Sequence, residues 1–392
     1  MTELTDLIAA DAPRCGLLAP APAAAVASLG AADAERERHI SARTARALTE
    51  AGFARHFVPR TWGGGEGGFA ELFDATVEVA GSCASAGWCG VLWAGHGRFA
   101  AFLPEEGQRD LWGRTPDVRI SAAVIPPTGS AEPEPEADGW RVRGRWRFAS
   151  GVDHADWVLV AAPERPADAD AGRRARALVF AVPRAEVEVI DSWNSVGLRG
   201  TGSHEIALDG VFVPRRRSFE MAAMMSGDAT PGRPAPYAAP AQLVGGVLLV
   251  AVALGAARRA LRLWSELVLG KAATGAASAA VPVWEAFARS SAELDAAGLL
   301  LREVARRADV DPRAEGAVAH GQRDAAVGAE LVVAAVDRLF RTGGSHGSDA
   351  AGDFQRAWRD VHTATGHAAL RLGPAAEAYA RVGTAALAAE GR

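Results

Sequence analysis

The 392-residue sequence is poor in cysteine and has no excess of basic charge. Its cysteines, Cys15, Cys83 and Cys89, follow no metal-ligand spacing, so we expect no metal site, and buried thiols fit them better than a disulfide framework. The formal net charge of -5 provides no global basic field for nucleic acid or anionic membrane. Acidic residues stand in the N-terminal segment where a secretory signal needs positive charge. We therefore expect a soluble, cytoplasmic protein with no nucleic-acid or membrane partner.

Two nucleotide-binding motifs are also absent. No GxGxxG motif follows a strand and opens a helix, so the chain lacks the fingerprint of a dinucleotide-binding domain. The glycine-rich segment 57–68 has no Walker lysine and no strand-to-helix setting, which favours a structural loop over a phosphate-binding loop. The apolar stretch 243–257 is short and is followed by arginines, so we expect a buried helix rather than a membrane span.

Hydrophobic periodicity divides the chain into three parts. Residues 1–116 show helical spacing of apolar residues, including a helix over 34–53 that Gly52 ends. At about residue 117 the period changes to that of strands, and from about residue 218 long amphipathic segments with short links predict a bundle. The sequence thus predicts an α+β multidomain protein with an N-terminal helical domain (1–116), a central antiparallel β domain (117–217) and a C-terminal four-helix bundle (218–392).

The central part consists of short alternating runs separated by Gly, Pro and Asp turns, the pattern of an antiparallel sandwich or barrel. Two polar segments, 128–139 and 163–176, are expected to be solvated loops. The expected strands are 118–127, 139–150, 156–163, 176–184, 187–193 and 204–214, and the expected bundle segments are 242–270, 281–308, 314–344 and 354–383.

A glycine-dense turn precedes the last of these strands. Gly197, Gly200 and Gly202 allow the backbone to take positive φ and to lie flat against another surface, which suits a planar ligand. Thr201 and Ser203 supply hydroxyl groups in the same turn. An ordinary hairpin explains the cluster equally well, so these residues alone leave the choice open.

His96 lies in an apolar helical segment between Gly95 and Gly97. A lone histidine in such a position is more often a core residue than a functional one. The flanking glycines, however, leave its ring approachable by a ligand. Both interpretations stay open at the level of these residues.

Four segments carry a resemblance to a known family. Residues 146–162 are similar to a flavin-flanking strand pair, and residues 192–214 to a Trp-x-x-x-Gly-x-Arg-Gly-Thr segment. Residues 87–112 and 354–370 are similar to stretches of one branch of that family. Together with the order of the three parts, they make nearly the whole chain resemble the acyl-CoA dehydrogenase superfamily, and within it the two-component flavin-dependent monooxygenases that hydroxylate phenols and polyketides.

The resemblance implies an oxygenase component that hydroxylates an aromatic or polyketide-like small molecule. Reduced flavin, FMN in preference to FAD, would react with O2 to form a C4a-hydroperoxide that attacks the substrate. Because the chain lacks a dinucleotide fingerprint, a separate NAD(P)H:flavin reductase is expected to supply the reduced flavin. The resemblance also implies a homotetramer. Relatives oxidise nitrogen or sulfur with the same intermediate, so the substrate and the atom oxidised stay open.

The same resemblance assigns roles to individual residues. It places Ser150 beside the flavin N5 atom, Ser121 at the ring edge and His367 near C4a. His96 is placed on the substrate side as the candidate base that makes a phenol more nucleophilic. Such a site must exclude water, because hydrolytic loss of the peroxide competes with oxygen transfer.

Further residues are assigned to the flavin with less specific support. Gly343 and Gly344 would meet the ribityl-phosphate arm across a subunit contact, as the resemblance implies. Arg258 is a candidate for the phosphate, although an arginine in such a helix is more often solvated. His154 and His362 are candidates that could orient the residues touching the ligand.

An acyl-CoA dehydrogenase is the main alternative. Such an enzyme needs a carboxylate base for the α-proton, but this chain has His362 and His367 in the region of the family's Glu-Gly-Thr segment, and residues 121–130 replace its Thr-Glu-Pro segment. Glu266 and Glu285 are candidates for a base placed elsewhere. An FAD-dependent dehydrogenase therefore stays an alternative, as does a catalytically silent relative kept for assembly or binding.

Overall fold

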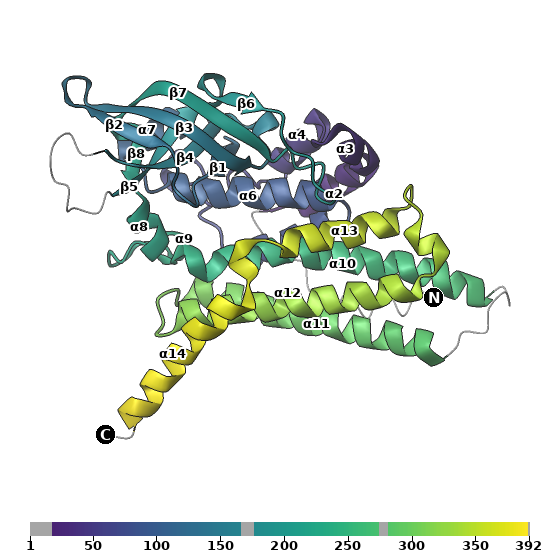
Figure 1. Ribbon diagram of the computed structural model, residues 1–392. Coiled ribbons are helices and arrows are strands. Elements are labelled where there is room, and N and C mark those ends of the chain that lie inside the picture. The colour runs from purple at the N-terminus through teal and green to yellow at the C-terminus, as the bar shows by residue number, and fades with distance from the viewer. Residues whose placement is uncertain (1–17, 166–175, 274–280, 391–392) are drawn as a thin grey trace.

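The computed structural model describes residues 18–165, 176–273 and 281–390. The strands gather on one side of the molecule, the long C-terminal helices on the other, and helix α6 lies between them (Figure 1). Cys83 and Cys89 are buried free thiols, as expected, whereas Cys15 lies outside the described residues. Residues 166–175 of the second expected loop lie outside them too.

The N-terminal part is helical, as predicted, but the helix expected over 34–53 is wrong as a single element. The chain breaks because Arg38 takes a left-handed φ of 64° and the backbone of His39 bridges to Thr201. Ser41 then caps a new helix. The elements are α2 (Pro20–Leu29), α3 (Ala31–Glu37), α4 (Ala42–Glu50), η1 (Arg60–Trp62), α5 (Phe69–Ala80), α6 (Ala84–Ala100) and α7 (Glu105–Trp112).

The strands form two four-stranded sheets with the orders β1-β4-β5-β8 and β2-β3-β7-β6. Neighbouring strands are antiparallel, as predicted, except that β1 and β4 are parallel. The strands are β1 (Ile120–Ala123), β2 (Ser130–Glu134), β3 (Gly139–Ala149), β4 (Trp157–Pro163), β5 (Ala177–Pro183), β6 (Glu188–Ile190), β7 (His204–Pro214) and β8 (Ser218–Glu220), joined in part by the short turns η2 (Pro135–Ala137), η3 (Val152–His154), η4 (Arg184–Glu186) and η5 (Arg215–Arg217).

Strand β2 was not expected, because it lies in the segment 128–139 that was predicted to be a solvated loop. Its residues pair with β3 along the register from Ser130 opposite Arg143 to Glu134 opposite Gly139. Backbone pairing at the edge of a sheet tolerates acidic and proline side chains that point to solvent. The strands end at Glu220, and the domain boundaries at 116 and 217 stay predictions.

The two sheets pack face to face over an apolar core. Trp140, Trp146 and Ile206 come from one sheet and Val160 and Phe180 from the other, and each is at most 2% exposed. Along β3 the buried residues alternate with polar ones, which is the period that the sequence shows, whereas β4 and β5 are apolar and buried on both faces.

Helices α10, α11, α12 and α13 pack as the predicted four-helix bundle (Figure 1). The last expected segment, 354–383, is wrong as one helix, because α13 ends at Thr365 and His367 takes an extended conformation with ψ of 139°. Figure 1 shows α14 turning away from the bundle. The elements are α8 (Met221–Ser226), α9 (Ala235–Ala238), α10 (Ala241–Ala273), α11 (Val281–Val310), α12 (Ala317–Thr342), η6 (Ser345–Ser348), α13 (Asp353–Thr365), η7 (Ala368–Leu370) and α14 (Leu372–Glu390).

Helix α10 is the centre of the molecule. It is apolar and long enough to cross a membrane, but 72% of its most apolar window is buried inside the protein, so it is a core helix. Near its start, Gly246 packs against Ala369 of η7, and further along Arg259 pairs with Asp353 at the start of α13. Helix α13 therefore runs antiparallel to α10. Arg259 also donates to the carbonyl of Ser82, just before α6, which places α6 against the same helix.

Candidate functional site

Four hydroxyl side chains that are distant in the sequence meet inside the protein. We term Ser121, Ser150, Thr201 and Ser203 the hydroxyl cluster. Ser150 Oγ lies 2.7 Å from Ser203 Oγ, which in turn lies 2.7 Å from Thr201 Oγ1. Ser121 Oγ donates to the backbone carbonyl of Ser150 at 3.0 Å. Each of the four is at most 5% exposed, so the structure brings together two residues assigned to the flavin, Ser121 and Ser150.

The sandwich and α6 position this cluster. Ser121 lies on β1, Ser150 directly follows β3, and the other two precede β7, the neighbour of β3 in its sheet. The amide of Gly151 donates to the carbonyl of Thr201 at 2.7 Å, which ties the turn after β3 to the loop before β7. From α6, the indole N–H of Trp88 donates to Ser150 Oγ at 3.1 Å.

Leu198 holds the loop before β7 in shape. It has a φ of 49°, a conformation that costs a non-glycine residue roughly 1–2 kcal/mol. Its carbonyl accepts hydrogen bonds from Trp193 Nε1 at 3.0 Å and from Thr201 Oγ1 at 2.9 Å. Its amide donates to Asp360 Oδ1 of α13 at 2.6 Å. These bonds offset the strain and connect the loop to the bundle.

The glycine-dense turn lies flat against protein rather than against a ligand at Gly197. A Cβ atom there would stand 2.2 Å from the carbonyl oxygen of Arg359, so only glycine lets the loop approach α13. The Arg359 guanidinium donates to the carbonyl of Val196 and, at 2.8 Å, to Glu35 Oε1. The turn is therefore a direct contact between the helical bundle and the sheet domain.

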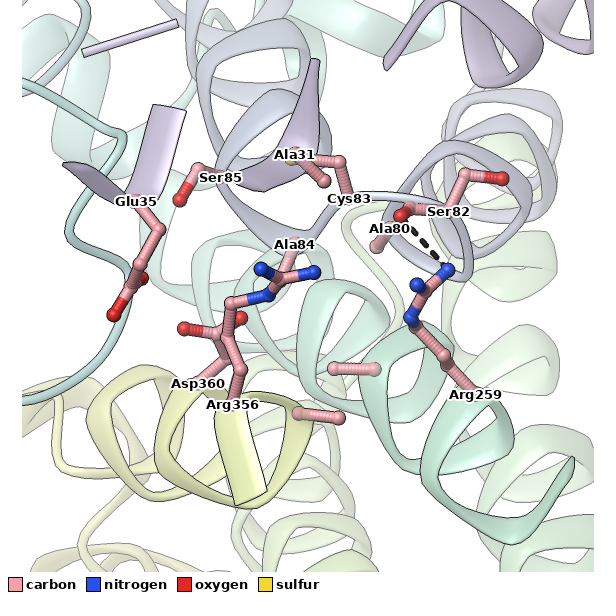
Figure 2. A pocket seen from close by; sticks show the side chains of 12 residues that line it. Ala31, Glu35, Ala80, Ser82, Cys83, Ala84, Ser85, Arg259, Arg356 and Asp360 are labelled. Atoms are coloured by element: carbon pink, nitrogen blue, oxygen red, sulfur yellow. Dashed lines mark hydrogen bonds between the residues drawn. The ribbon is translucent and has the colours of Figure 1, made fainter. Parts of the chain in front are cut away.

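A cavity of about 20 Å³ lies behind this loop, lined among others by Glu35, Cys83, Arg356 and Asp360. Figure 2 shows Asp360 and Arg356 extending from α13 into this space. The volume suits about one water molecule, so neither a flavin nor a phenol fits there. Burial raises the pKa of Asp360 to about 7, and its bond from the Leu198 amide opposes this rise only in part.

His96 is buried, but only one of its two ring nitrogens is used in a hydrogen bond to the protein. It is 6% exposed, and its Nδ1 lies 2.9 Å from the carbonyl oxygen of Ile120, the residue before Ser121. Because a carbonyl only accepts, Nδ1 carries the proton and Nε2 has the free lone pair. Burial lowers the pKa of His96 to about 4, so the ring is neutral at neutral pH. The two interpretations of this histidine are therefore compatible.

One face of the otherwise buried α6 is partly open beside His96. Gly95 and Phe99 are half-buried, and no atom lies within 4 Å of the Cβ position at Gly95. The same holds for Gly245 on α10. Arg98 donates to the carbonyl of Ala239, just before α10 begins, so both open positions lie at the same end of the two helices. These two positions leave open space beside α6 at the end of the helix that carries His96.

Two aromatic side chains lie at the surface next to the hydroxyl cluster. Phe148, two residues before Ser150, is 61% exposed and packs edge to face with Trp193 at 5.7 Å between ring centroids. Val196 of the same loop is 71% exposed. These exposed apolar groups are available for contact with a ligand or another subunit.

His367 lies at the surface of the single chain. It caps the short turn η7, where its Nδ1 accepts from the Ala369 amide at 3.2 Å. Because η7 packs near Gly246, His367 lies at the same end of α10 as the open face of α6. No described hydrogen bond joins it to the hydroxyl cluster.

Gly343 and Gly344 lie toward the other end of the bundle. They follow α12 next to Thr342, whose hydroxyl accepts from Trp264 Nε1 at 3.0 Å. Trp264 is separated from Gly246 by a rise of about 27 Å along α10, at 1.5 Å per residue. Gly344 has a φ of 69° and no atom within 4 Å of its Cβ position. These glycines therefore lie far along α10 from Gly246 and η7, and no hydrogen bond in the described part of the chain joins them to the hydroxyl cluster.

Arg258 is half-buried on α10 and turns toward α11. One of its guanidinium nitrogens lies 2.9 Å from the position a Cβ would take at Gly298, and the carboxylates of Asp295 and Asp74 interact with it electrostatically. Burial lowers the pKa of Arg258. This setting favours a structural role within its own chain over phosphate binding.

His154 and His362 are held by protein groups. His154 Nε2 lies 2.6 Å from the carbonyl of Ile40, and His362 Nε2 lies 2.8 Å from Asp337 Oδ1. Neither is hydrogen bonded to the hydroxyl cluster in the part of the chain that the structure describes. His154 thus connects η3 to the segment before α4, and His362 connects α13 to α12.

Sequence reasoning missed Trp88, Leu198 and Asp360. Asp360 had a detectable signal, because it stands beside Val361 on the apolar face of an amphipathic helix, where an acid is unusual. Trp88 and Leu198 had none, since their roles depend on residues up to 162 positions away.

Comparison with known proteins gives consistent results. The acyl-CoA dehydrogenase, C-terminal domain family matches residues 247–372. The chain is 33% identical over 359 residues to the oxygenase component of an FADH(2)-dependent resorcinol hydroxylase from Rhizobium sp. (strain MTP-10005), covering 86% of both chains. It is 30% identical over 350 residues to the flavin-dependent monooxygenase oxygenase subunit HsaA of Mycobacterium tuberculosis (strain ATCC 25618 / H37Rv), covering 85% of this chain and 86% of HsaA. The structure of XiaF from Streptomyces sp. in complex with FADH2 and glycerol superposes with a TM-score of 0.84 at 26% identity, over 92% of this chain and 93% of XiaF.

Proposed function

This chain belongs to the family of flavin-dependent monooxygenase oxygenase components, and we propose that it hydroxylates the ring of a phenolic small molecule. The observation that carries the choice of a phenol is His96, a neutral imidazole with a free Nε2 lone pair beside the open face of α6. Resorcinol, which the Rhizobium relative is named for, is such a phenol.

The described residues fit a flavin. The hydroxyl cluster offers neutral groups in a buried setting, which suits an uncharged ring edge, and Ser150 keeps an unused lone pair. Phe148 and Trp193 present aromatic surface next to it. A reduced flavin bound there supplies the electrons that activate O2. Ser121 and Ser150 would hold the ring, with Ser150 toward N5.

His96 polarises the substrate rather than removing its proton outright. A phenol has a pKa of about 10, which is far above the pKa of His96 of about 4. The imidazole Nε2 therefore accepts a hydrogen bond from the phenol O–H and increases electron density on the ring carbons. The Ile120 carbonyl keeps the ring in the tautomer that makes this possible.

Water exclusion requires more than one chain. The hydroxyl cluster is buried, but His367 and Gly344 are exposed. We propose that Gly343 and Gly344 of a second subunit receive the ribityl-phosphate arm, in a homotetramer. His367 is proposed to face C4a. Arg258 would have to leave its place against Gly298 of α11 before it could bind the phosphate.

Reduced FAD is the first candidate flavin, because the Rhizobium relative and the XiaF complex both carry FADH2 in their names. The preference for FMN that the sequence suggested stays a prediction, as does a cytoplasmic location. A separate NAD(P)H:flavin reductase is the expected partner. Glu266 and Glu285, the bases suggested for a dehydrogenase, are both exposed.

The test uses the purified full-length protein with resorcinol as the probe. It is expected to be nearly colourless, to bind reduced flavin more tightly than oxidised flavin, and to form a hydroxylated product only when a flavin reductase and NADH are added. Isotopically labelled O2 should appear in the product. NADH oxidation by the protein alone, or reduction of an artificial acceptor with an acyl thioester, would contradict the proposal.

A further inference from the structure

The direction of each hydrogen bond in the hydroxyl cluster follows from its two ends. Thr201 Oγ1 lies 2.9 Å from the Leu198 carbonyl, which can only accept, so the Thr201 hydrogen points to Leu198. The Ser203 hydroxyl, 2.7 Å from Thr201 Oγ1, must then donate to it. The Ser150 hydroxyl, 2.7 Å from Ser203 Oγ, must likewise donate to Ser203. At the other end, the indole N–H of Trp88 can only donate, and it reaches Ser150 Oγ at 3.1 Å.

This order leaves Ser150 a single role toward a ligand. A hydroxyl has one hydrogen and two lone pairs. The hydrogen is used by Ser203 and one lone pair by Trp88, so only one lone pair is left. We propose that Ser203 and Thr201 fix Ser150 as a hydrogen-bond acceptor, and that the site thereby selects reduced over oxidised flavin.

The selection follows from the chemistry of flavin N5. Reduced flavin has a hydrogen on N5 and donates it, whereas oxidised flavin has a lone pair there and accepts. An acceptor at Ser150 therefore satisfies the reduced ring and leaves the oxidised ring with two lone pairs facing each other. The inference rests on the proposed function, in which Ser150 lies beside N5. It makes Ser203, Thr201 and Trp88 positioning residues that act through Ser150.

Such a preference suits an oxygenase that is supplied with flavin by another protein. It must capture reduced flavin from solution and release oxidised flavin after each turnover. A fixed row of hydroxyl groups provides the discrimination without any charged group, and none of the four members of the hydroxyl cluster is ionisable near neutral pH.

Two substitutions disturb the order while leaving the fold intact. Ser203→Ala frees the Ser150 hydrogen, and Thr201→Val keeps the side-chain shape but removes the hydroxyl. In Thr201→Val the Leu198 carbonyl still accepts from Trp193 Nε1 at 3.0 Å and from the Thr201 amide at 3.1 Å, so it is not left unpaired. In both variants the Ser150 hydrogen can turn toward the ligand.

Two further variants serve as controls. Thr201→Ser retains the hydroxyl and should keep the order of hydrogen bonds. Ser290→Ala removes an equally buried hydroxyl, 0% exposed, which donates to the Ala335 carbonyl in the bundle at 3.2 Å. It reports the effect of losing a buried hydroxyl that has no connection to the flavin.

The experiment is an anaerobic titration of each variant with oxidised and with reduced FAD, and with FMN in parallel. The measured quantity is the ratio of the two dissociation constants. Ser203→Ala and Thr201→Val should lower the wild-type preference for reduced flavin about three- to tenfold, the value of one hydrogen bond. Thr201→Ser and Ser290→Ala should preserve it.

The outcomes separate the inference from the function on which it rests. A selective wild-type protein whose preference is unchanged in both Ser203→Ala and Thr201→Val overturns the inference alone. An equal fall in Ser290→Ala also overturns it, because the effect is then not specific to the cluster. A wild-type protein that binds both oxidation states equally contradicts the proposed function itself.

Discussion

Two regions of the molecule contain the residues assigned to the flavin and the substrate, and they differ in how much of a site one chain supplies. Between α6 and the sandwich, His96 and the hydroxyl cluster are at most 6% exposed and are held by hydrogen bonds within the chain. In the bundle, His367 and Gly344 are exposed and lie toward opposite ends of α10. One chain builds the first region fully and the second only in part.

This difference separates the groups proposed for the chemistry from the groups proposed to hold the cofactor. Groups that touch reacting atoms need fixed geometry, and the residues proposed for that role lie on α6, on β1 and directly after β3 of a single chain. Groups that hold a remote arm of a cofactor can come from another subunit. Asp360 joins the two regions, because it extends from α13 and holds the Leu198 amide at 2.6 Å. Three substitutions therefore test this comparison. His96 belongs to the region between α6 and the sandwich, Asp360 links the two regions, and Gly344 belongs to the bundle.

The largest effect is expected from His96→Asn. Asparagine can still donate to the Ile120 carbonyl, so the protein should fold and bind reduced flavin normally. Without the Nε2 acceptor, product formation should fall by about a hundredfold or more, the usual contribution of such a group. Reduced flavin would then be consumed with release of hydrogen peroxide. The ratio of product to hydrogen peroxide measures this directly.

The pH dependence sharpens this prediction. The defect should lessen as the pH approaches about 10, where a phenol ionises unaided. In the wild type, His96 is neutral above its pKa of about 4, so its protonation should cause no loss of activity near pH 6.5. A variant that loses stability but keeps the product ratio would show that His96 is only a core residue.

Periodicity alone was enough for the three-part architecture. Short apolar runs located six strands: β3 alternates because it buries one face, whereas β4 and β5 are buried on both faces and are apolar throughout. Helical spacing located the bundle. Strand β2 was missed because its acidic and proline side chains carry no alternation, and backbone pairing with β3 decides its structure. The break between α13 and α14 was missed because apolar residues continue at helical spacing past Gly366.

For the site, the sequence identified individual residues but not the contacts between them. The resemblance placed Ser121 and Ser150 together, and the structure joins them by a hydrogen bond. It could not show the direction of the hydrogen bonds, since that depends on Trp88 and Leu198, which no local pattern marks. It also could not show that Gly197 meets α13 rather than a ligand, because only the tertiary contact reveals this.

The second prediction concerns Asp360 and stability. Burial raises the pKa of Asp360 from an ordinary value of 3.8 to about 7 in the folded state. The folded protein therefore binds a proton more tightly than the unfolded chain, and the resulting stabilisation, complete below about pH 4, is lost as the pH rises through about 7. Between about pH 5.5 and pH 8 this amounts to about 2 kcal/mol.

Asp360→Asn isolates this contribution, because asparagine keeps the oxygen that accepts from the Leu198 amide but does not titrate. Its free energy of unfolding should lack the decrease that the wild type shows over that pH range. Chemical denaturation at several pH values gives both curves, and other titrating groups cancel in their difference. Parallel curves for the two proteins would mean that Asp360 is ionised throughout.

The smallest effect is expected at Gly344, where a side chain would enter the space proposed for the flavin arm. Asparagine tolerates a φ of 69°, and no atom lies within 4 Å of the Cβ position, so Gly344→Asn should fold. Affinity for reduced flavin should fall about tenfold, or about 1.4 kcal/mol. Gly232→Asn is the matched control, with a φ of 80° and equally open space, and should keep wild-type affinity.

Mixed oligomers decide whether Gly344 serves its own chain or another. If each site combines His96 of one subunit with Gly344 of a second, coexpressed His96→Asn and Gly344→Asn chains form some sites in which both residues are wild type. Random pairing makes about a quarter of the sites complete. Product formation at limiting flavin should then exceed the mean of the two separate variants severalfold. Activity equal to that mean would show that one chain supplies both residues.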